Sequence, residues 1–218
     1  PDIVNRGVGT PDNLDGITPE IFMNSGNNQF TRLPTNLPNL TMGGMDWADY
    51  DGDNDMDVVY NGVITPWGNG VFCAVYKNNG NGNFTPLNSF INSSSSKIKW
   101  FDFNHDGKLD VISDGGYTGE GGLFVKNLGN DSFHVSSFNF PANQYYENAT
   151  IIDDFNNDGL IDVITVGGNL NDVDCDYKNS SALVFGRGWS LTGIPKFTEV
   201  ANISAIGSNN YYSWGDFD

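Results

Sequence analysis

Residues 49–59, with the sequence DYDGDNDMDVV, place five acidic residues in nine positions and continue directly into an apolar, β-branched run. Carboxylates held about 4 Å apart repel one another by about 4 kcal/mol per pair at an effective dielectric constant of about 20. Two hypotheses account for the segment: a solvated acidic turn, or an oxygen-rich loop that encloses a cation. The rest of the chain bears on this choice because the segment is repeated.

Two further full copies of the pattern are present, and each end of the chain carries half a copy. The full copies are WFDFNHDGKLDVI at 100–112 and IDDFNNDGLIDVI at 152–164, and the halves are PDIV at 1–4 and WGDFD at 214–218. The last aspartates of successive copies, at positions 2, 57, 110 and 162, lie 55, 53 and 52 residues apart. A fixed period of this length predicts an array of one repeated supersecondary unit.

We therefore treat the chain as a single domain, or part of one, made of four units at approximately 1–55, 56–108, 109–160 and 161–218. Asp216 follows Asp154 by 62 residues, which indicates an insertion in the last unit. Each period contains an apolar run, the acidic loop, a β-branched strand, a variable loop and a hairpin with Asn/Gly turn residues. No segment shows sustained helical periodicity. These features predict an all-β protein with four short antiparallel strands per unit.

A four-stranded sheet of this kind has two apolar faces and cannot bury both by itself. Sheets packed face to face around an axis bury both faces, and the result is a β-propeller. A linear β-solenoid is the alternative, but its coils are usually shorter and lack hairpin turns. We predict a β-propeller with four-stranded antiparallel blades.

Acidic or amide side chains occupy the odd positions of all three complete loops, where a tightly curled loop directs side chains inward. A hard cation with six to eight oxygen ligands converts their repulsion into binding, and Ca²⁺ suits such flexible cages better than Mg²⁺. The expected ligands are Asp49, Asp51, Asp53, Asp55 and Asp57 in the first loop, Asp102, Asn104, Asp106, Lys108 and Asp110 in the second, and Asp154, Asn156, Asp158, Leu160 and Asp162 in the third. Position 7 of each loop (Asp55, Lys108 and Leu160) is expected to contribute its backbone carbonyl.

Position 6 of the loops is Asn54, Gly107 or Gly159, residue types that tolerate the positive φ of a sharp turn. An EF-hand is excluded because position 12 is not glutamate and the flanking segments are strands rather than helices. Asp2, Asp216 and Asp218 belong to partial loops. We predict about three bound Ca²⁺ ions, one in each complete loop.

The pattern D-x-[DN]-x-D-[GN]-x-x-D followed by β-branched residues resembles the FG-GAP, or VCBS, repeat of integrin α-subunit propellers and many secreted bacterial proteins. The resemblance covers all four units. It implies a propeller, most often seven-bladed, with Ca²⁺ in the loops that join the first two strands of blades, and an extracellular, secreted or cell-surface location. Four units fall short of seven, so the chain is expected to continue into further blades.

The net charge of −17 arises from 27 acidic residues against 10 basic ones, and eleven of the acids lie within the three complete loops. Three calcium ions would reduce the net charge to −11. This acidity argues against nucleic acid and anionic membranes as partners, and no apolar run approaches the roughly 20 residues of a membrane span. Cys73 and Cys175 are interpreted as free thiols, because two cysteines in such different local settings do not make a disulfide framework.

Aromatic residues divide into a recurring set and a non-recurring set. Trp47, Trp100 and Trp214 hold one repeat position and are expected in the core. Trp67 and Trp189 break the repeat, and with Tyr117 and Tyr177 they are candidates for contacting a ligand. His105 and His134 are interpreted as structural, since neither lies near a nucleophile motif or a second histidine.

The favoured function is a non-catalytic, calcium-binding extracellular adhesion or binding module for a protein or glycan. The alternatives are a propeller-fold polysaccharide lyase or glycosidase and a structural spacer in a large surface protein. An enzyme would need the acids outside the loops to converge with a base or an arginine, but the chain scatters them across units. Those acids are Glu20, Glu120, Glu147, Asp172, Asp174 and Glu199.

Overall fold

The computed structural model describes residues 3–5, 19–40, 43–63, 71–91, 97–113, 122–138, 145–154, 162–169, 179–189 and 195–204. Every regular element in these ranges is a β-strand, which confirms the all-β prediction. The described part of the chain has no helix long and apolar enough to cross a membrane.

Four antiparallel sheets follow one another along the chain, and we number them 1 to 4 in that order. Sheet 1 contains β1 (Ile3–Asn5), β2 (Glu20–Gly26) and β3 (Gln29–Leu33). Sheet 2 contains β4 (Met45–Ala48), β5 (Asp57–Val63), β6 (Val71–Asn78) and β7 (Phe84–Ile91). Sheet 3 contains β8 (Ile98–Phe101), β9 (Asp110–Ser113), β10 (Gly122–Gly129) and β11 (Ser132–Phe138). Sheet 4 contains β12 (Tyr145–Asp153), β13 (Asp162–Asn169), β14 (Asn179–Trp189) and β15 (Pro195–Ser204).

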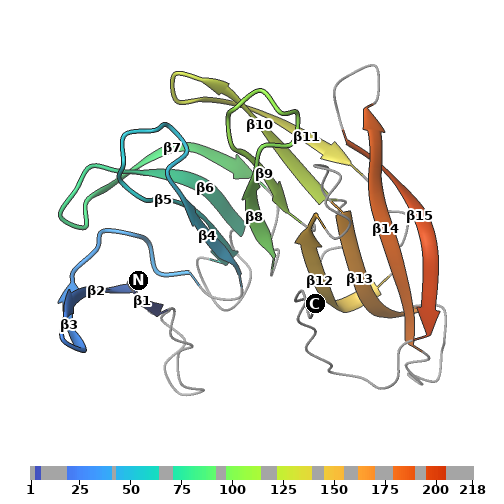
Figure 1. The fold of residues 1–218 in the computed structure, drawn as a ribbon, viewed down its shortest axis with the longest axis horizontal. Helices are drawn as coiled ribbons and strands as arrows, with labels where there is room; N and C mark the ends of the chain where they lie inside the picture. Colours follow the sequence, from blue (N-terminus) through green and yellow to red (C-terminus); the bar gives the residue numbers. More distant parts are fainter. Residues whose placement is uncertain are drawn as a thin grey trace.

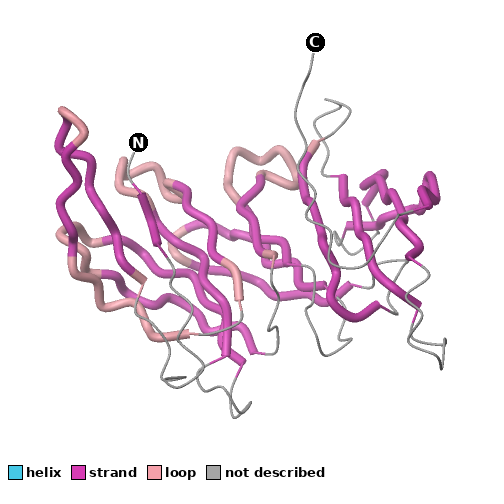
Figure 2. The backbone as a smooth tube through the Cα atoms, turned by 90° about the horizontal axis from the view of Figure 1, so that it is seen from below, coloured by secondary structure: helices cyan, strands magenta, loops and turns pink. Residues whose placement is uncertain are grey.

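Each sheet is a meander in which strands that follow one another in the chain are also neighbours in space. The sheets succeed one another along an arc, with the first strand of each sheet toward the inside of the arc and the last strand toward the outside (Figure 1). Seen from below, strands make up most of the described backbone (Figure 2). Sheets 2 to 4 have the expected four strands, whereas three strands are described in sheet 1.

The hydrophobic core lies on both faces of sheet 2. Successive strand residues point to opposite faces, so Val58 and Tyr60 of β5 join one buried cluster while Val59 joins the other. The first cluster includes Ile21 of sheet 1, and the second includes Val111 of sheet 3. Burial on both faces explains why all seven residues of β5 are buried.

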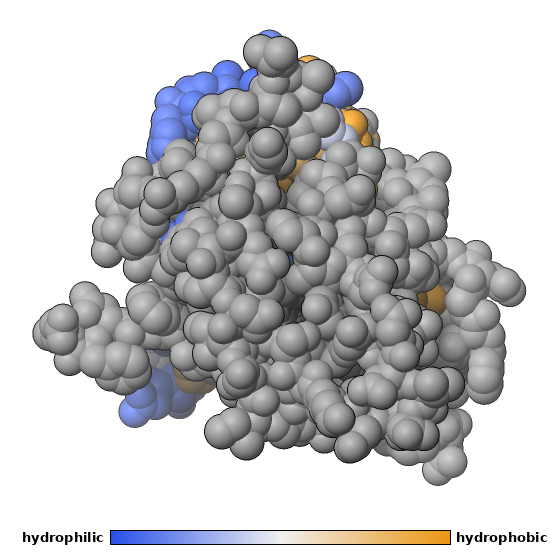
Figure 3. All heavy atoms as spheres, turned by 90° about the vertical axis from the view of Figure 1, so that its right-hand side faces the viewer, coloured by the Kyte–Doolittle hydropathy of each residue, from blue (hydrophilic) through white to orange (hydrophobic). Residues whose placement is uncertain are grey.

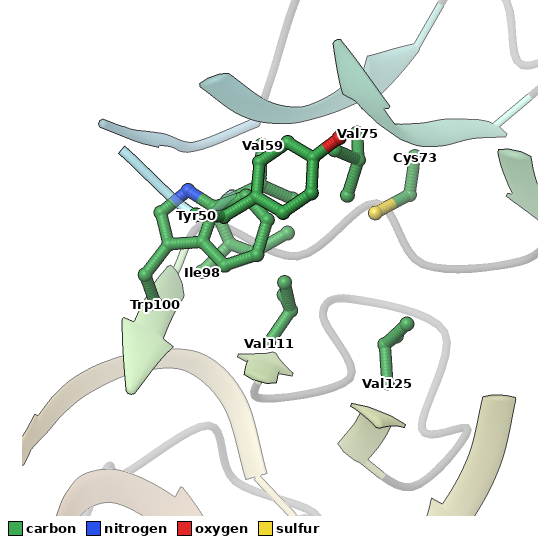
Figure 4. Close-up of a cluster of buried hydrophobic side chains, with 8 residues drawn as sticks. All are labelled: Tyr50, Val59, Cys73, Val75, Ile98, Trp100, Val111 and Val125. Carbon is green, nitrogen blue, oxygen red and sulfur yellow. The ribbon is translucent and has the colours of Figure 1, made fainter. Parts of the chain in front are cut away.

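The cluster between sheets 2 and 3 is built around two aromatic rings. Tyr50 lies parallel to Trp100, with ring centroids 5.5 Å apart and planes 5° apart, and Val59, Cys73 and Val75 face the side chains of sheet 3 (Figure 4). Trp100 is buried, and the half-buried Trp47 packs edge-on against Phe84 at 5.9 Å. The predicted core role of these two tryptophans is therefore confirmed, while Trp214 lies outside the described residues.

Each four-stranded sheet takes its first strand from the end of one sequence unit and its other strands from the next. Sheet 2, for example, begins at Met45 in the first unit, and its remaining strands belong to the second. The acidic loops therefore lie within sheets, between their first and second strands, rather than between sheets.

Candidate metal centre

The acidic loops hold equivalent places in sheets 2, 3 and 4. They join β4 to β5, β8 to β9 and β12 to β13. The last aspartate of each loop is the first residue of the second strand, and it pairs with the last residue of the first strand: Ala48 with Asp57, Phe101 with Asp110, and Asp153 with Asp162. These three aspartates are 0%, 1% and 0% exposed. Burial of charged groups at one repeated position requires a compensating interaction.

The first loop is folded around its own carboxylates. The Asp49 carboxylate accepts hydrogen bonds from the amides of Gly52 and Asp53 at 2.8 and 3.0 Å through Oδ1, and from the amide of Asn54 at 3.0 Å through Oδ2. The Asp53 amide also donates to Asp51 Oδ1 at 3.3 Å, and the Asp55 amide donates to Asp53 Oδ1 at 2.9 Å. These bonds turn the carboxylates at positions 1, 3 and 5 toward the inside of the loop.

The second loop repeats this frame. Asp102 accepts from the amides of Asp106 at 3.1 Å and Gly107 at 2.8 Å. The Asp106 amide also donates to Asn104 Oδ1 at 3.0 Å, and the Lys108 amide donates to Asp106 Oδ1 at 3.0 Å. The loops share only part of their sequence, so the common frame depends on the oxygen-bearing side chains at positions 1, 3 and 5.

Two positions in each loop have positive φ. At position 6, Asn54 has φ of 70° and Gly107 of 81°, as expected. Position 4 is also left-handed, with φ of 79° at Gly52 and 56° at His105. Position 4 was not predicted from the sequence, although histidine is among the non-glycine residue types that are enriched in this conformation.

The first loop brings oxygen atoms together at the spacing of a coordination shell. One carboxylate oxygen from each of Asp49, Asp51 and Asp57 lies within 4.8 Å of the others. Ligands 2.3–2.6 Å from a Ca²⁺ ion are separated by at most about 5 Å. The sequence-predicted residues at positions 1, 3 and 9 are thus placed where one cation could contact all three.

Amide hydrogen bonds compensate only in part for the burial of Asp57 and Asp110. Burial raises the pKa of Asp57 to about 6; the amides of Asn78 and Tyr50 oppose this rise, and the charges of Asp51 and Asp53 add to it. Burial likewise raises the pKa of Asp110 to about 6, against the lowering effect of the Asn127 amide. A raised pKa means that the ionised form is unfavourable where it stands, and a bound cation would reverse that preference.

One buried oxygen has no donor at full hydrogen-bond geometry. Oδ1 of Asp110 accepts a hydrogen bond from the Asn127 amide at 2.7 Å. No described residue donates to its buried Oδ2 at that geometry, although the Phe103 amide is near enough to the carboxylate to lower its pKa. An unsatisfied buried carboxylate oxygen at the mouth of an acidic loop fits a missing cation ligand. Among the described residues, only the first loop gathers three carboxylates at coordination spacing, so the fit to a hard divalent ion depends on Asp49, Asp51 and Asp57.

Sequence reasoning missed an asparagine that ties the loop to the third strand in sheets 2 and 3. The Asn78 amide donates to Asp57 Oδ1 at 2.8 Å, and its Nδ2 donates to the Met56 carbonyl at 3.1 Å. Asn127 makes the matching bonds to Asp110 and to the Leu109 carbonyl, at 2.7 and 3.1 Å. The available signal was the recurrence of MNSG at 23–26, KNNG at 77–80 and KNLG at 126–129.

The remaining predicted residues are only partly placed. Asp154 and Asp162 begin and end the third loop, while Asn156, Asp158 and Leu160 lie outside the described residues. Of the acids considered for an enzyme, Glu20 of β2 pairs with Arg32 at 2.7 Å, and Glu147 and Glu199 are on β12 and β15. Trp189 ends β14. The following candidates also lie outside the described residues: Asp2, Asp216, Asp218, Trp67, Tyr117, Tyr177, Glu120, Asp172, Asp174 and Cys175.

A scan against protein-family models finds no match to this chain, and a search of curated proteins finds none either.

Proposed function

We propose that the acidic loops are calcium sites and that calcium stabilises the sheets that contain them. The observation that carries this proposal is the buried last aspartate of each loop, with an Asp110 oxygen that no described residue bonds at full hydrogen-bond geometry and an oxygen cluster around Asp57. Calcium in this place would join three strands of one sheet, since the aspartate lies on the second strand, pairs with the first and is bonded to the third. The same frame is present in sheets 2 and 3, so the role belongs to the repeat.

We further propose that the sheets are blades of a β-propeller of the FG-GAP or VCBS type, and that the propeller continues into further blades. Three features support this: the arc of four sheets, the radial order of strands within each sheet, and the buried faces between neighbouring sheets (Figure 1). Because the second sheet is buried on both sides, a blade at either end of the arc needs a neighbour to cover its outer face.

As the function of this scaffold we propose non-catalytic binding of a protein or glycan outside the cell. The second strands of sheets 2 to 4 begin at the acidic loops and end at the opposite end of each sheet, so that end is left for recognition. From the side of sheet 4, the described atoms in view are mostly hydrophilic, with small hydrophobic areas (Figure 3).

Calcium binding is tested by calorimetric titration of chelator-treated protein and by thermal unfolding in calcium, magnesium and EDTA. We expect calcium to raise the Tm well above its value in EDTA, and magnesium to have a smaller effect. Asp53→Asn and Asp55→Asn provide a matched pair, because both remove one exposed negative charge from the same loop. Asp53 offers its side chain and Asp55 its carbonyl, so we expect a greater loss of affinity from Asp53→Asn.

Equal losses of calcium affinity in Asp53→Asn and Asp55→Asn would indicate that affinity depends on the total charge of the loop rather than on coordination by the Asp53 side chain. An unchanged Tm at saturating calcium would overturn the metal proposal.

The binding role is tested separately with a glycan array and with protein pull-downs in calcium. A hit that is lost in Trp67→Ala supports the proposed rim. A hit lost in Trp189→Ala would instead place the ligand at the end of the acidic loops, because Trp189 ends β14 beyond Phe185, the partner of Asp162. Depolymerisation of a polysaccharide, lost on replacing acids outside the loops, would instead show an enzyme. If the protein is folded but binds no ligand in these assays, the role of a structural spacer remains.

A further inference from the structure

A lysine from the third strand of sheet 2 lies inside the first acidic loop. The Nζ atom of Lys77 is in direct contact with Asp51 Oδ2, and it is 3.8 Å from Asp53 Oδ2. The contact with Asp51 raises the pKa of Lys77, so the amine is held in its charged form. Asp51 and Asp53 are both predicted calcium ligands, so the ammonium stands against oxygens that a metal ion would use.

A carboxylate of the neighbouring sheet is also within reach of Lys77. Asp131 Oδ1 lies 4.0 Å from Nζ and accepts a hydrogen bond from the Tyr50 hydroxyl at 2.6 Å. Asp131 belongs to the two-residue turn between β10 and β11, where Asn130 and Asp131 have φ of 52° and 57°. Tight turns of this kind have little conformational freedom, so the position of this carboxylate is well determined.

We propose that the Lys77 ammonium is the internal counter-ion of the first loop in the metal-free protein, and that calcium binding displaces it from Asp51 to Asp131 of sheet 3. This inference rests on the proposed calcium site. A divalent ion in the loop would repel an ammonium from the carboxylates it coordinates. Of the carboxylates paired with Lys77 within 4.0 Å, Asp131 alone lies outside the loop.

The displacement would link metal binding to the contact between sheets 2 and 3. In the metal-free state Lys77 neutralises charge within sheet 2. After displacement, the Lys77–Asp131 pair would join the third strand of sheet 2 to a turn of sheet 3, beside the existing Tyr50–Asp131 bond. Calcium would then strengthen packing between sheets as well as within one sheet.

The second loop supplies a matched control. Val58 pairs with Tyr76 in sheet 2, and Val111 pairs with Val125 in sheet 3, so Lys77 and Lys126 stand at the same register position. Lys126 influences Asp106 and Asp110 through its charge, but it forms no ion pair with a described carboxylate. Lys126→Met therefore removes one positive charge at the equivalent position of sheet 3, and it breaks no ion pair with a described carboxylate.

The test compares Lys77→Met with Lys126→Met and wild type by thermal unfolding in EDTA and in calcium, and by calorimetric calcium titration. We expect Lys77→Met to lower the Tm by about 2–4 °C in EDTA and to strengthen one calcium-binding event several-fold. Lys126→Met should leave the Tm in EDTA within about 1 °C of wild type. Equal effects of the two substitutions on the Tm in EDTA and on calcium affinity would overturn the inference.

A second measurement follows the Lys77 amine directly. Reductive ¹³C-methylation keeps lysine charged, and the Lys77 signal is assigned by its loss in Lys77→Arg. We expect this signal to shift on calcium addition in wild type and not to take the same shift in Asp131→Asn. A wild type that binds calcium while the Lys77 signal stays unmoved refutes the displacement alone. A wild type that binds no calcium refutes the proposed metal site, and the inference falls with it.

Discussion

Asp57 and Asp110 begin the second strands of sheets 2 and 3, and each has two roles that oppose each other in the metal-free protein. Asp57 and Asp110 organise their loops by accepting amide hydrogen bonds from the third strand. Both are fully buried, and burial raises the pKa of each to about 6. A residue that is unfavourable when ionised, yet recurs in each complete repeat, is better explained by a ligand than by stability of the chain alone.

Asp110→Asn should separate these roles. The folded pKa of about 6 exceeds the ordinary value of 3.8, so the folded metal-free protein binds more protons than the unfolded chain between these pH values. The free energy of unfolding of the metal-free protein therefore decreases as the pH rises from about 4 to about 6. The Asp110 carboxyl accounts for up to about 3 kcal/mol of this decrease. In EDTA at pH 7.5 we expect Asp110→Asn to have a higher Tm than wild type, and in calcium a lower one.

Thermal unfolding at pH 4.5 and 7.5, with and without calcium, checks this expectation. A variant that is less stable than wild type under all four conditions would show that the carboxylate is needed for the fold itself.

Cys73 should report on unfolding. Its side chain is buried in the cluster between sheets 2 and 3, and burial raises the pKa of the thiol to about 12. Since the thiolate is the reactive form, the native thiol should resist modification. In a Cys175→Ser background, we expect a thiol reagent to label Cys73 only at the rate of unfolding. Rapid labelling in native buffer would contradict the buried placement.

At the scale of elements, the β6–β7 hairpin determines how sheet 2 meets the segment that follows sheet 1. Asn36 Nδ2 donates to the Phe84 carbonyl at 3.0 Å, and the Phe84 amide donates back to Asn36 Oδ1 at 2.8 Å. Gly82, in the hairpin turn, lies against the carbonyl of Pro34, where a Cβ atom would overlap it. The turn is therefore shaped by a neighbouring segment as well as by its own Asn/Gly sequence.

Gly80→Ala and Gly82→Ala should differ for this reason. Both glycines have positive φ, 82° and 78°, so alanine at either costs about 1–2 kcal/mol of conformational strain. A Cβ at Gly80 meets open space, whereas a Cβ at Gly82 meets backbone. We expect Gly82→Ala to cost a further 1–3 kcal/mol, roughly, from overpacking. Chemical denaturation of the two variants measures the difference in their free energies of unfolding. Equal losses would show that the segment containing Pro34 moves to accommodate the added Cβ at little cost.

For the whole molecule, the contact between sheets decides whether a row of small sheets behaves as one structure. Tyr50 sits at position 2 of the first acidic loop, yet it stacks on Trp100 and bonds to Asp131, both in sheet 3. Asp46 of β4 likewise accepts a hydrogen bond from the Trp100 amide at 2.8 Å. Residues in and beside the loop thus connect the candidate metal centre of one sheet to the packing of the next.

Tyr50→Phe and Tyr50→Ala should separate the contribution of the Tyr50 hydroxyl bond from that of its buried ring. The phenylalanine variant keeps the ring and loses the bond to a charged acceptor, for an expected cost of about 1.5 kcal/mol. The alanine variant also loses the buried ring, for an expected cost of about 3–5 kcal/mol. Denaturant titration in EDTA gives both values. If Asp131→Asn and Tyr50→Phe showed purely additive losses, the hydroxyl bond would not contribute to the contact between sheets.

The sequence by itself determined the strand class, the positions of the acidic loops and the residues that face into them. These properties are local: alternation follows from strand geometry, turns follow from Asn and Gly, and the loop carboxylates bond to amides a few residues away. The recurrence of DVV, DVI and DVI after the loops placed the buried aspartates at strand starts. The order of apolar run, loop and strand, together with the family resemblance, indicated that each loop joins the first two strands of a sheet. It could not give the register of those strands, because register depends on contacts between strands.

Only the tertiary structure decided the rest. It placed Asn78 and Asn127 beside the buried aspartates, Lys77 among the carboxylates of the first loop, and Asp131 within reach of both Tyr50 and Lys77. These contacts join residues from different strands or different sheets. Their distances are determined by sheet register and by face-to-face packing, two properties that no single segment of the chain contains.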